Sequence, residues 1–213
     1  MIVVDSSGTG DPNSKRIGLP GRVSLKLSVS PDFSSTEFFQ QDKPGINYGI
    51  TAGYRITRRW SVYTGVIMAT KIYSSTSVSE SYNTPGGYNY PISQLDGNCK
   101  MLDIPVNVYY SFNPNKSLSF KAGLGFSSYI ILQEDYTYYL DKPYGKNSYS
   151  QRIENENNEW FKMMNVSVIM QKKIHSRLFL EVEPFVKLPL AGIGEGEIPL
   201  YSIGSFISLR YDF

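Results

Sequence analysis

The C-terminal segment Ile198–Phe213 is the feature of this sequence that most constrains its fold. Large apolar residues occupy every second position towards its end, apart from Ser205, and small or charged residues lie between them. A period of two predicts a strand with one apolar face. An unpaired edge of such a strand is an aggregation site, so we expect closure into a barrel, which pairs both edges. The alternating apolar residues are Ile203, Ile207, Leu209, Tyr211 and Phe213.

Seven further segments show the same alternation, which predicts eight strands. Short turns at 57–59, 113–116 and 172–177 alternate with the polar stretches Ser30–Gly45, Ser74–Gly97 and Glu134–Asn158, which we expect to be loops. In an antiparallel barrel, alternate connections lie at the same rim. The other predicted strands are Val23–Val29, Ile46–Arg55, Trp60–Tyr73, Leu102–Tyr110, Leu118–Ser127, Trp160–Met170 and Leu178–Leu188.

Two kinds of eight-stranded barrel fit this alternation. A transmembrane barrel turns its apolar face outwards and has short turns at one rim and long loops at the other. A soluble barrel of the lipocalin kind turns the apolar face inwards, around a small ligand. Glycine residues on the polar face, beside long charged side chains, favour a crowded polar interior and therefore the membrane barrel. These glycines are Gly49, Gly53, Gly123, Gly125 and Gly204.

Aromatic residues near the strand ends also favour the membrane. Amphipathic rings prefer a membrane interface, and no run of eighteen apolar residues exists that could form a spanning helix. We therefore predict an all-β fold, an eight-stranded antiparallel up-and-down transmembrane β-barrel with a side-chain-filled lumen. The interfacial aromatic residues are Tyr54, Trp60, Tyr110, Trp160 and Tyr211.

The N-terminal residues 1–21 differ in composition from the rest of the chain. They lack the basic and apolar regions of a secretory signal and are rich in Gly, Ser, Asp and Pro. We expect a flexible periplasmic lead-in or linker over 1–21, followed by the outer-membrane barrel over 22–213.

Charged residues on the polar faces of the strands are expected to form an ion-pair network in the lumen, because buried charges require partners. For Glu181 and Glu183, the partners could be Arg210 on the neighbouring strand, Lys187 on the same strand, or Lys26 on the first strand. The predicted network is Lys26, Arg55, Asp103, Lys121, Glu181, Glu183, Lys187 and Arg210.

Composition argues against several functions. A net charge of +2 with dispersed basic residues argues against a nucleic-acid partner. The single Cys99 excludes an internal disulfide and has no metal-ligand spacing, and the only histidine, His175, lies in a basic turn without a nucleophile. Because Glu181 and Glu183 share one strand, they do not flank a substrate cleft. We expect no enzyme activity, no catalytic residues, no metal and no cofactor.

Three segments resemble known outer-membrane proteins. The alternation of Ile207, Leu209, Tyr211 and Phe213 is similar to the C-terminal signature that the barrel-assembly machinery reads in Gram-negative bacteria. LDIPVNVYYSF (Leu102–Phe112) and LEVEPFVKLPLAGIG (Leu180–Gly194) resemble the PorT-like small outer-membrane β-barrel family. The resemblance implies an outer-membrane location, with outer-membrane lipid and the assembly machinery as partners. Because transmembrane barrels have short periplasmic turns and long extracellular loops, we expect both termini on the periplasmic side.

The resemblance also implies functions. Some relatives carry such a barrel at the C-terminal end of a longer anti-sigma factor that crosses both membranes, so we expect a membrane anchor or an envelope structural or signalling domain. The alternative is a surface binding or adhesion module with an envelope or surface protein partner, acting through tyrosine-rich loops. These tyrosines could equally form a loop rim near the headgroups. They are Tyr82, Tyr88, Tyr90, Tyr136, Tyr138, Tyr139, Tyr144 and Tyr149.

Overall fold

The computed structural model describes residues 21–36, 44–75, 92–114, 116–142, 145–154, 158–194 and 199–213. Nine strands cover most of them, and none of the described residues forms a helix long and apolar enough to cross a membrane. The predicted lead-in, apart from Gly21, lies outside these residues. The strands are β1 (Val23–Ser35), β2 (Gly45–Arg55), β3 (Trp60–Ser75), β4 (Ile92–Ser111), β5 (Leu118–Lys142), β6 (Gly145–Glu154), β7 (Asn158–Lys173), β8 (Leu178–Pro189) and β9 (Tyr201–Asp212).

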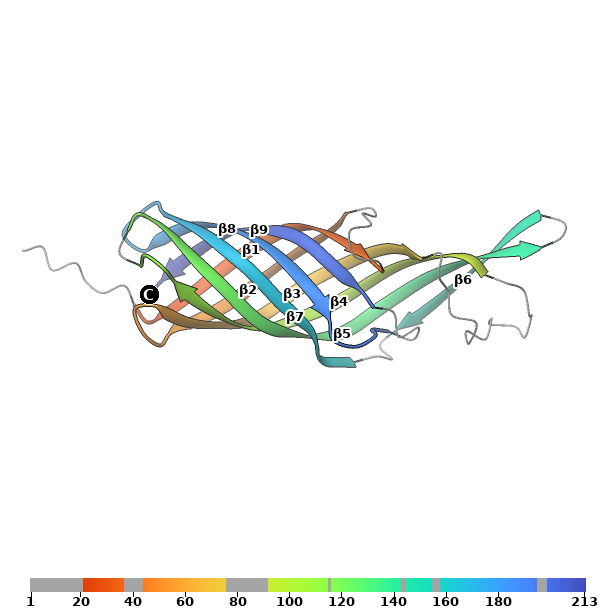
Figure 1. Ribbon diagram of the computed structural model, residues 1–213, viewed down its shortest axis with the longest axis horizontal. Helices are drawn as coiled ribbons and strands as arrows, with labels where there is room; N and C mark the ends of the chain where they lie inside the picture. The colour runs from red at the N-terminus through yellow and green to blue at the C-terminus, as the bar shows by residue number, and fades with distance from the viewer. Residues whose placement is uncertain are drawn as a thin grey trace, which may run out of the picture.

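Eight of these strands close into an antiparallel barrel. The order is β4-β3-β2-β1-β9-β8-β7-β5, and the pairing of β4 with β5 closes the ring. Strand β9 has a partner on each edge, since Arg210 lies opposite Lys26 of β1 and Phe179 of β8. The three short turns and the C-terminus share the left-hand end of the barrel in Figure 1. The predicted fold class is therefore confirmed.

The apolar faces of the strands point outwards. On β1, for example, Val23, Leu25, Leu27 and Val29 are exposed, whereas Ser24 and Lys26 between them are buried. This arrangement is the reverse of a lipocalin, so the soluble alternative is wrong. Exposed aromatic residues mark the end with the short turns, as expected at a membrane interface. They include Tyr54, Trp60, Phe112, Tyr211 and Phe213.

Strands β4, β5 and the additional strand β6 correct the predicted loops. Residues 92–97 belong to β4, and most of the stretch Glu134–Asn158 continues β5 or forms β6, which pairs with β5 alone. The predicted loop Ser30–Gly45 likewise begins as strand up to Ser35. Polar residues dominate these stretches, which is why the sequence predicted loops. Figure 1 shows the strands that continue beyond the barrel on its right-hand side.

Aromatic rings, rather than charged side chains, crowd three of the five glycines predicted on the polar face, Gly53, Gly123 and Gly204. A Cβ atom at Gly53 would collide with the ring of Tyr63, and one at Gly123 would collide with the ring of Tyr109. The two rings meet edge to face, with centroids 5.4 Å apart. Glycine therefore gives space for two large buried side chains within a narrow barrel.

Candidate functional site

The charged interior begins near the short turns with Glu181 and Glu183 of β8. Glu181 Oε1 lies 3.2 Å from both Lys121 Nζ and Arg210 Nη1. Lys26 Nζ donates a hydrogen bond of 2.9 Å to Glu183 Oε2 and lies 3.8 Å from Glu181 Oε2. All five side chains are almost completely buried. Two acids and three bases from four strands therefore form one network.

Neutral groups complete the surroundings of Glu183. Its Oε1 atom accepts hydrogen bonds from the Tyr109 hydroxyl at 2.7 Å and from Ser167 Oγ at 2.9 Å. A cavity of about 30 Å³ lies beside Lys26, Tyr109 and Glu183. Its volume is sufficient for about two water molecules, not for a substrate.

A second group of charges lies farther along the barrel. Lys71 Nζ donates to Asp32 Oδ2 at 2.6 Å and to Ser202 Oγ at 2.8 Å. Asp32 also accepts hydrogen bonds from Asn47 Nδ2 and Ser34 Oγ, both at 2.7 Å. Sequence reasoning missed this pair because it placed Asp32 in a loop. The alternation of buried Asp32 and Ser34 with exposed Pro31 and Phe33 was the available signal.

The remaining predicted members of the network have partners that sequence reasoning did not give. Lys187 forms an ion pair with Asp103 of β4, across the barrel, and has no ion pair with Glu181 or Glu183. Arg55 lies at the rim, where its Nη2 atom donates to Asp212 Oδ2 at 2.9 Å. All eight predicted residues thus lie in or at the mouth of the lumen, and Asp32, Lys71 and Asp212 join them.

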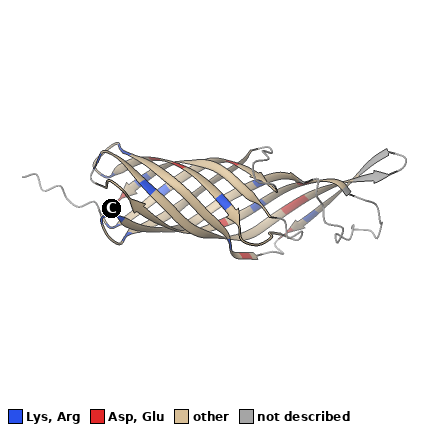
Figure 2. Ribbon diagram, viewed as in Figure 1, with Lys and Arg blue, Asp and Glu red and all other residues tan. Residues whose placement is uncertain are grey.

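The charged residues of this interior have a structural role. Buried charges are tolerated only when they are paired, and the acids described here each contact a base. Eight strands enclose little more space than side chains occupy, and the small cavity beside Lys26 is too small for a substrate. Figure 2 shows basic and acidic residues on facing strands of the barrel. Packed side chains therefore occupy the lumen where a pore protein would have an open channel.

The polarity of the two strand faces reverses along β4. From Tyr110 back to Leu102, outward residues such as Val108 and Val106 are apolar, and the inward residues include Asp103. Between Met101 and Ile92, towards the start of β4, the outward residues include Lys100, Asn98 and Asp96. Met101, Cys99 and Leu95 are buried there. A bulge in the pairing with β5 lies at the same level, between Lys100 and Met101. We call residues 92–101, 131–142 and 145–154 the extension.

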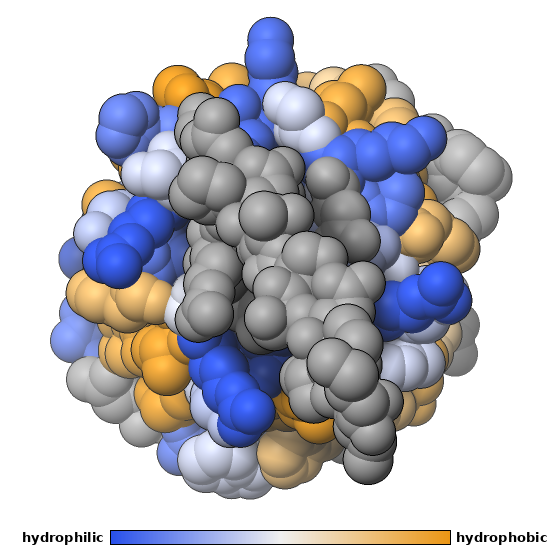
Figure 3. All heavy atoms as spheres, turned by 90° about the vertical axis from the view of Figure 1, so that its left-hand side faces the viewer, coloured by the Kyte–Doolittle hydropathy of each residue, from blue (hydrophilic) through white to orange (hydrophobic). Residues whose placement is uncertain are grey.

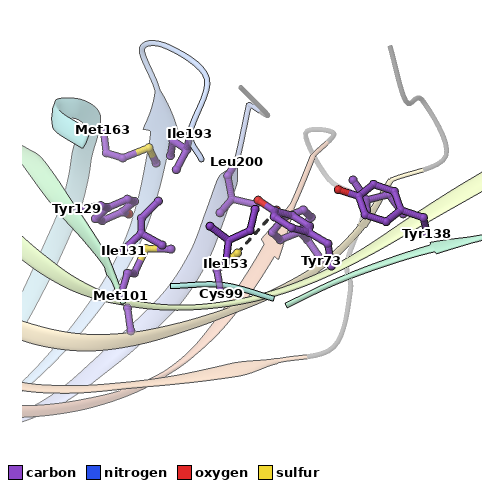
Figure 4. Packing of buried hydrophobic residues seen from close by; sticks show 13 residues of the cluster. Tyr73, Cys99, Met101, Tyr129, Ile131, Tyr138, Ile153, Met163, Ile193 and Leu200 are labelled. Atoms are coloured by element: carbon purple, nitrogen blue, oxygen red, sulfur yellow. Dashed lines mark hydrogen bonds between the residues drawn. The ribbon is translucent and has the colours of Figure 1, made fainter. Parts of the chain in front are cut away.

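The interior of the extension is an aromatic and aliphatic cluster. Tyr136 and Tyr138 are each 1% exposed, which corrects their assignment to a surface aromatic patch. Figure 4 draws the 13 residues of the cluster, ten of them labelled, and a dashed line marks the contact between the Tyr73 hydroxyl and Cys99 Sγ, which are 3.8 Å apart. The cluster consists of Ala69, Tyr73, Leu95, Cys99, Met101, Tyr129, Ile131, Tyr136, Tyr138, Ile153, Met163, Ile193 and Leu200.

The other predicted patch residues differ in their placement. Tyr149 on β6 is exposed, and Tyr139 on β5 is half-buried. Tyr82, Tyr88, Tyr90 and Tyr144 lie outside the described residues. His175 is exposed in its turn, and the described part of the chain contains no cluster of acidic, Cys and His residues suited to a metal ion.

The apolar outer surface, the ion-paired interior and the closed ring of eight strands define an outer-membrane β-barrel. Residues 18–167 match the outer membrane protein beta-barrel domain model. The chain belongs to this family, and its location is the outer membrane. A comparison with curated proteins gave no match.

Solved structures show the same fold. Neisserial surface protein A (NspA) is 11% identical, with a TM-score of 0.54 over 91% of this chain and 98% of that one. Ail, the attachment invasion locus protein of Yersinia pestis, is 11% identical, with a TM-score of 0.50 over 92% of this chain and 100% of that one. At this identity the likeness extends to the fold alone.

Proposed function

We propose that this barrel anchors a surface binding module, and that the extension is the binding part. The reversal of polarity along β4 is the observation that carries this proposal. Outward residues change from Val106 to Asn98 and Asp96, which is the change expected where a strand passes from lipid into water. The strands thus hold a folded surface outside the membrane.

The extension is suited to recognition because it is ordered on both faces. Its inner face is packed by the aromatic cluster, and its outer face carries hydrogen-bonded polar groups. Arg152 Nε donates to Asp135 Oδ1 at 2.6 Å, and Gln133 Nε2 donates to Asp135 Oδ2 at 2.5 Å. Slight burial acts to raise the pKa of Asp135, but these hydrogen bonds outweigh it and lower the pKa. Asp135 therefore stays ionised on a preorganised polar surface.

The filled lumen supports an anchoring role rather than transport or catalysis. Its carboxylates contact basic residues on several strands, so none is left to act on a substrate. We propose that the protein is not an enzyme, that its termini are periplasmic, and that its binding partner is an envelope or surface macromolecule. Insertion would use the assembly machinery, and the exposed residues Ile207, Leu209, Tyr211 and Phe213 are available to it.

The PorT-like assignment and the anti-sigma arrangement are finer hypotheses within this proposal. The segments Leu102–Phe112 and Leu180–Gly194 support the first. An upstream reading frame that encodes an inner-membrane helix and a cytoplasmic domain would support signalling, and the absence of such a frame would leave the binding module.

Cysteine labelling in whole cells tests the orientation of the extension. Ser150 and Ser176 are both exposed, in β6 and in the turn between β7 and β8. We expect Ser150→Cys to react with a membrane-impermeant maleimide in intact cells. The matched variant Ser176→Cys should react only after permeabilisation, because its turn faces the periplasm. The reverse pattern would refute the proposed orientation.

In-cell photo-crosslinking tests binding itself. A photoreactive residue in place of Thr137, on the outer face of the extension, should give a reproducible macromolecular adduct. The same residue in place of Val168, on the lipid face of β7, is the control and should crosslink to lipid. If Thr137 gave only intramolecular products, the extension would not be a binding surface.

A further inference from the structure

The three short turns share a composition that the anchoring role does not require. Each contains an exposed apolar side chain beside one or more cations. Ile56 precedes Arg58 and Arg59, Phe112 precedes Lys116, and Ile174 lies among Lys172, Lys173 and Arg177. Since the turns are distributed around the rim, this pairing of apolar and basic groups recurs around the barrel. Figure 3 shows hydrophilic and hydrophobic side chains spaced around this end.

The positive charge of this rim is not neutralised by the described residues around it. Asp212 is the only acidic side chain in the described segments 21–24, 54–61, 109–114, 116–119, 171–179 and 210–213, and it is buried against Arg55 and Arg210. Seven other cations are exposed, and none forms an ion pair within the described part of the chain. They are Arg22, Arg58, Arg59, Lys116, Lys172, Lys173 and Arg177.

A tyrosine at this rim holds one of these cations in place. Arg59 Nη1 donates to the Tyr110 hydroxyl at 2.8 Å, and the guanidinium carbon lies 5.9 Å from the centre of that ring. Tyr110 in turn packs edge to face against Trp60, with centroids 5.0 Å apart. A guanidinium fixed in this way keeps several N–H donors free for an anionic oxygen.

We propose that this rim binds the phosphates of anionic phospholipids in the adjacent leaflet. A basic residue close to a membrane surface attracts anionic lipids, and an apolar neighbour that enters the interface strengthens the contact. Lipid is favoured over a protein or cell-wall partner because the cations occur on all three turns. A shell of lipid surrounds the rim, whereas a single macromolecule would need one basic face.

The two tryptophans provide reporters for the two ends of the barrel. Trp60 follows Arg59 at the basic rim, and Trp160 lies at the opposite end, at the start of β7. Each is isolated by the variants Trp160→Phe and Trp60→Phe in the full chain. Tryptophan fluorescence is measured in phosphatidylcholine vesicles. A fraction of the lipid is brominated phosphatidylcholine or brominated phosphatidylglycerol, which quenches the fluorescence of a tryptophan close to it.

We expect phosphatidylglycerol to be preferred at Trp60 by about fivefold, which corresponds to one engaged cation. Trp160 should show no such preference. High salt should weaken the preference at Trp60, because exposed charges are screened. Soluble glycerol phosphate should not compete, since it lacks the acyl chains that place lipid at Ile56, Phe112 and Ile174. Competition by glycerol phosphate would indicate a simple phosphate site and overturn the lipid assignment.

A pair of double variants separates the rim from general charge. Arg58→Gln with Arg59→Gln removes the two cations next to Trp60 in the chain and should abolish most of the preference at Trp60. Lys100→Gln with Arg152→Gln removes the same charge from the extension and should leave the preference unchanged. Equal quenching by both lipids at Trp60 in the unmodified rim would overturn the proposal. So would binding of peptidoglycan fragments without a lipid preference, since it would assign the rim to the cell wall.

Discussion

The barrel within the membrane and the extension beyond it have opposite interiors. In the barrel, Lys26, Lys71 and Glu183 are buried and valines cover the outside. In the extension, Tyr136 and Leu95 are buried and polar side chains cover the outside. The strands β4 and β5 run through both regions without interruption. The difference teaches that alternation creates two faces, while the solvent outside decides which face carries the charges.

The two interiors also differ in what stabilises them. Lipid outside the barrel removes the usual hydrophobic advantage of an apolar core, so the interior can be polar provided that its hydrogen bonds are satisfied. In the extension, water outside favours burial of apolar and aromatic area at about 25 cal/mol per Å². A disturbance of charge pairing should therefore affect the barrel most.

The largest effect is expected from orphaning a buried lysine. Asp32→Ala leaves Lys71, which is 0% exposed, without its ion-pair partner. We expect a loss of about 3–5 kcal/mol in the free energy of unfolding, measured with urea in lipid vesicles. Glu183→Ala should cost less, because Lys26 keeps Glu181 at 3.8 Å.

Two controls sharpen this prediction. Lys71→Met added to Asp32→Ala removes the orphaned charge and should restore much of the stability. Lys172→Ala, in an exposed turn, should change stability by no more than about 0.5 kcal/mol. A loss at Asp32→Ala equal to that at Lys172→Ala would show that the interior charges do not stabilise the barrel.

A smaller effect is expected from a charge on the outer face. Leu124→Arg places a guanidinium in the apolar band and should cost about 2–4 kcal/mol in lipid vesicles. Thr137→Arg, on the outer face of the extension, should cost almost nothing, because water surrounds it. Similar costs at the two positions would place both in the same medium and break the comparison between barrel and extension.

The smallest effect is expected for the alkylation of Cys99, which is measured on the unmodified chain. Burial in the cluster, and then the nearby charge of Glu134, raises the pKa of this thiol to about 12. Only about one thiol in 10,000 is therefore ionised at pH 8, and the thiolate is the reactive form. We expect no alkylation by iodoacetamide in the folded protein and rapid alkylation in urea, followed by mass spectrometry. Rapid modification of folded protein would mean that the extension opens readily.

The sequence by itself determined the faces of the strands and the closure of the barrel. A period of two placed Glu181, Glu183 and Lys187 on one face, and the pairing needs of the last strand required neighbours on both sides. It also identified the rim with the short turns, since turn chemistry is local. Each of these features depends on residues that are close together in the chain.

Only the tertiary structure decided which charges meet and where the polarity of the strand faces reverses. Lys187 pairs with Asp103 and Lys71 with Asp32 across the interior, between strands that are not neighbours, so these contacts depend on how the closed sheet is staggered. Tyr136 and Tyr138 appeared to be loop residues because their polar neighbours on β5 face water. Their burial arises from the neighbouring strand β6 and from residues of β3 and β4 that are distant in the chain, and this second contribution exists only in the tertiary structure.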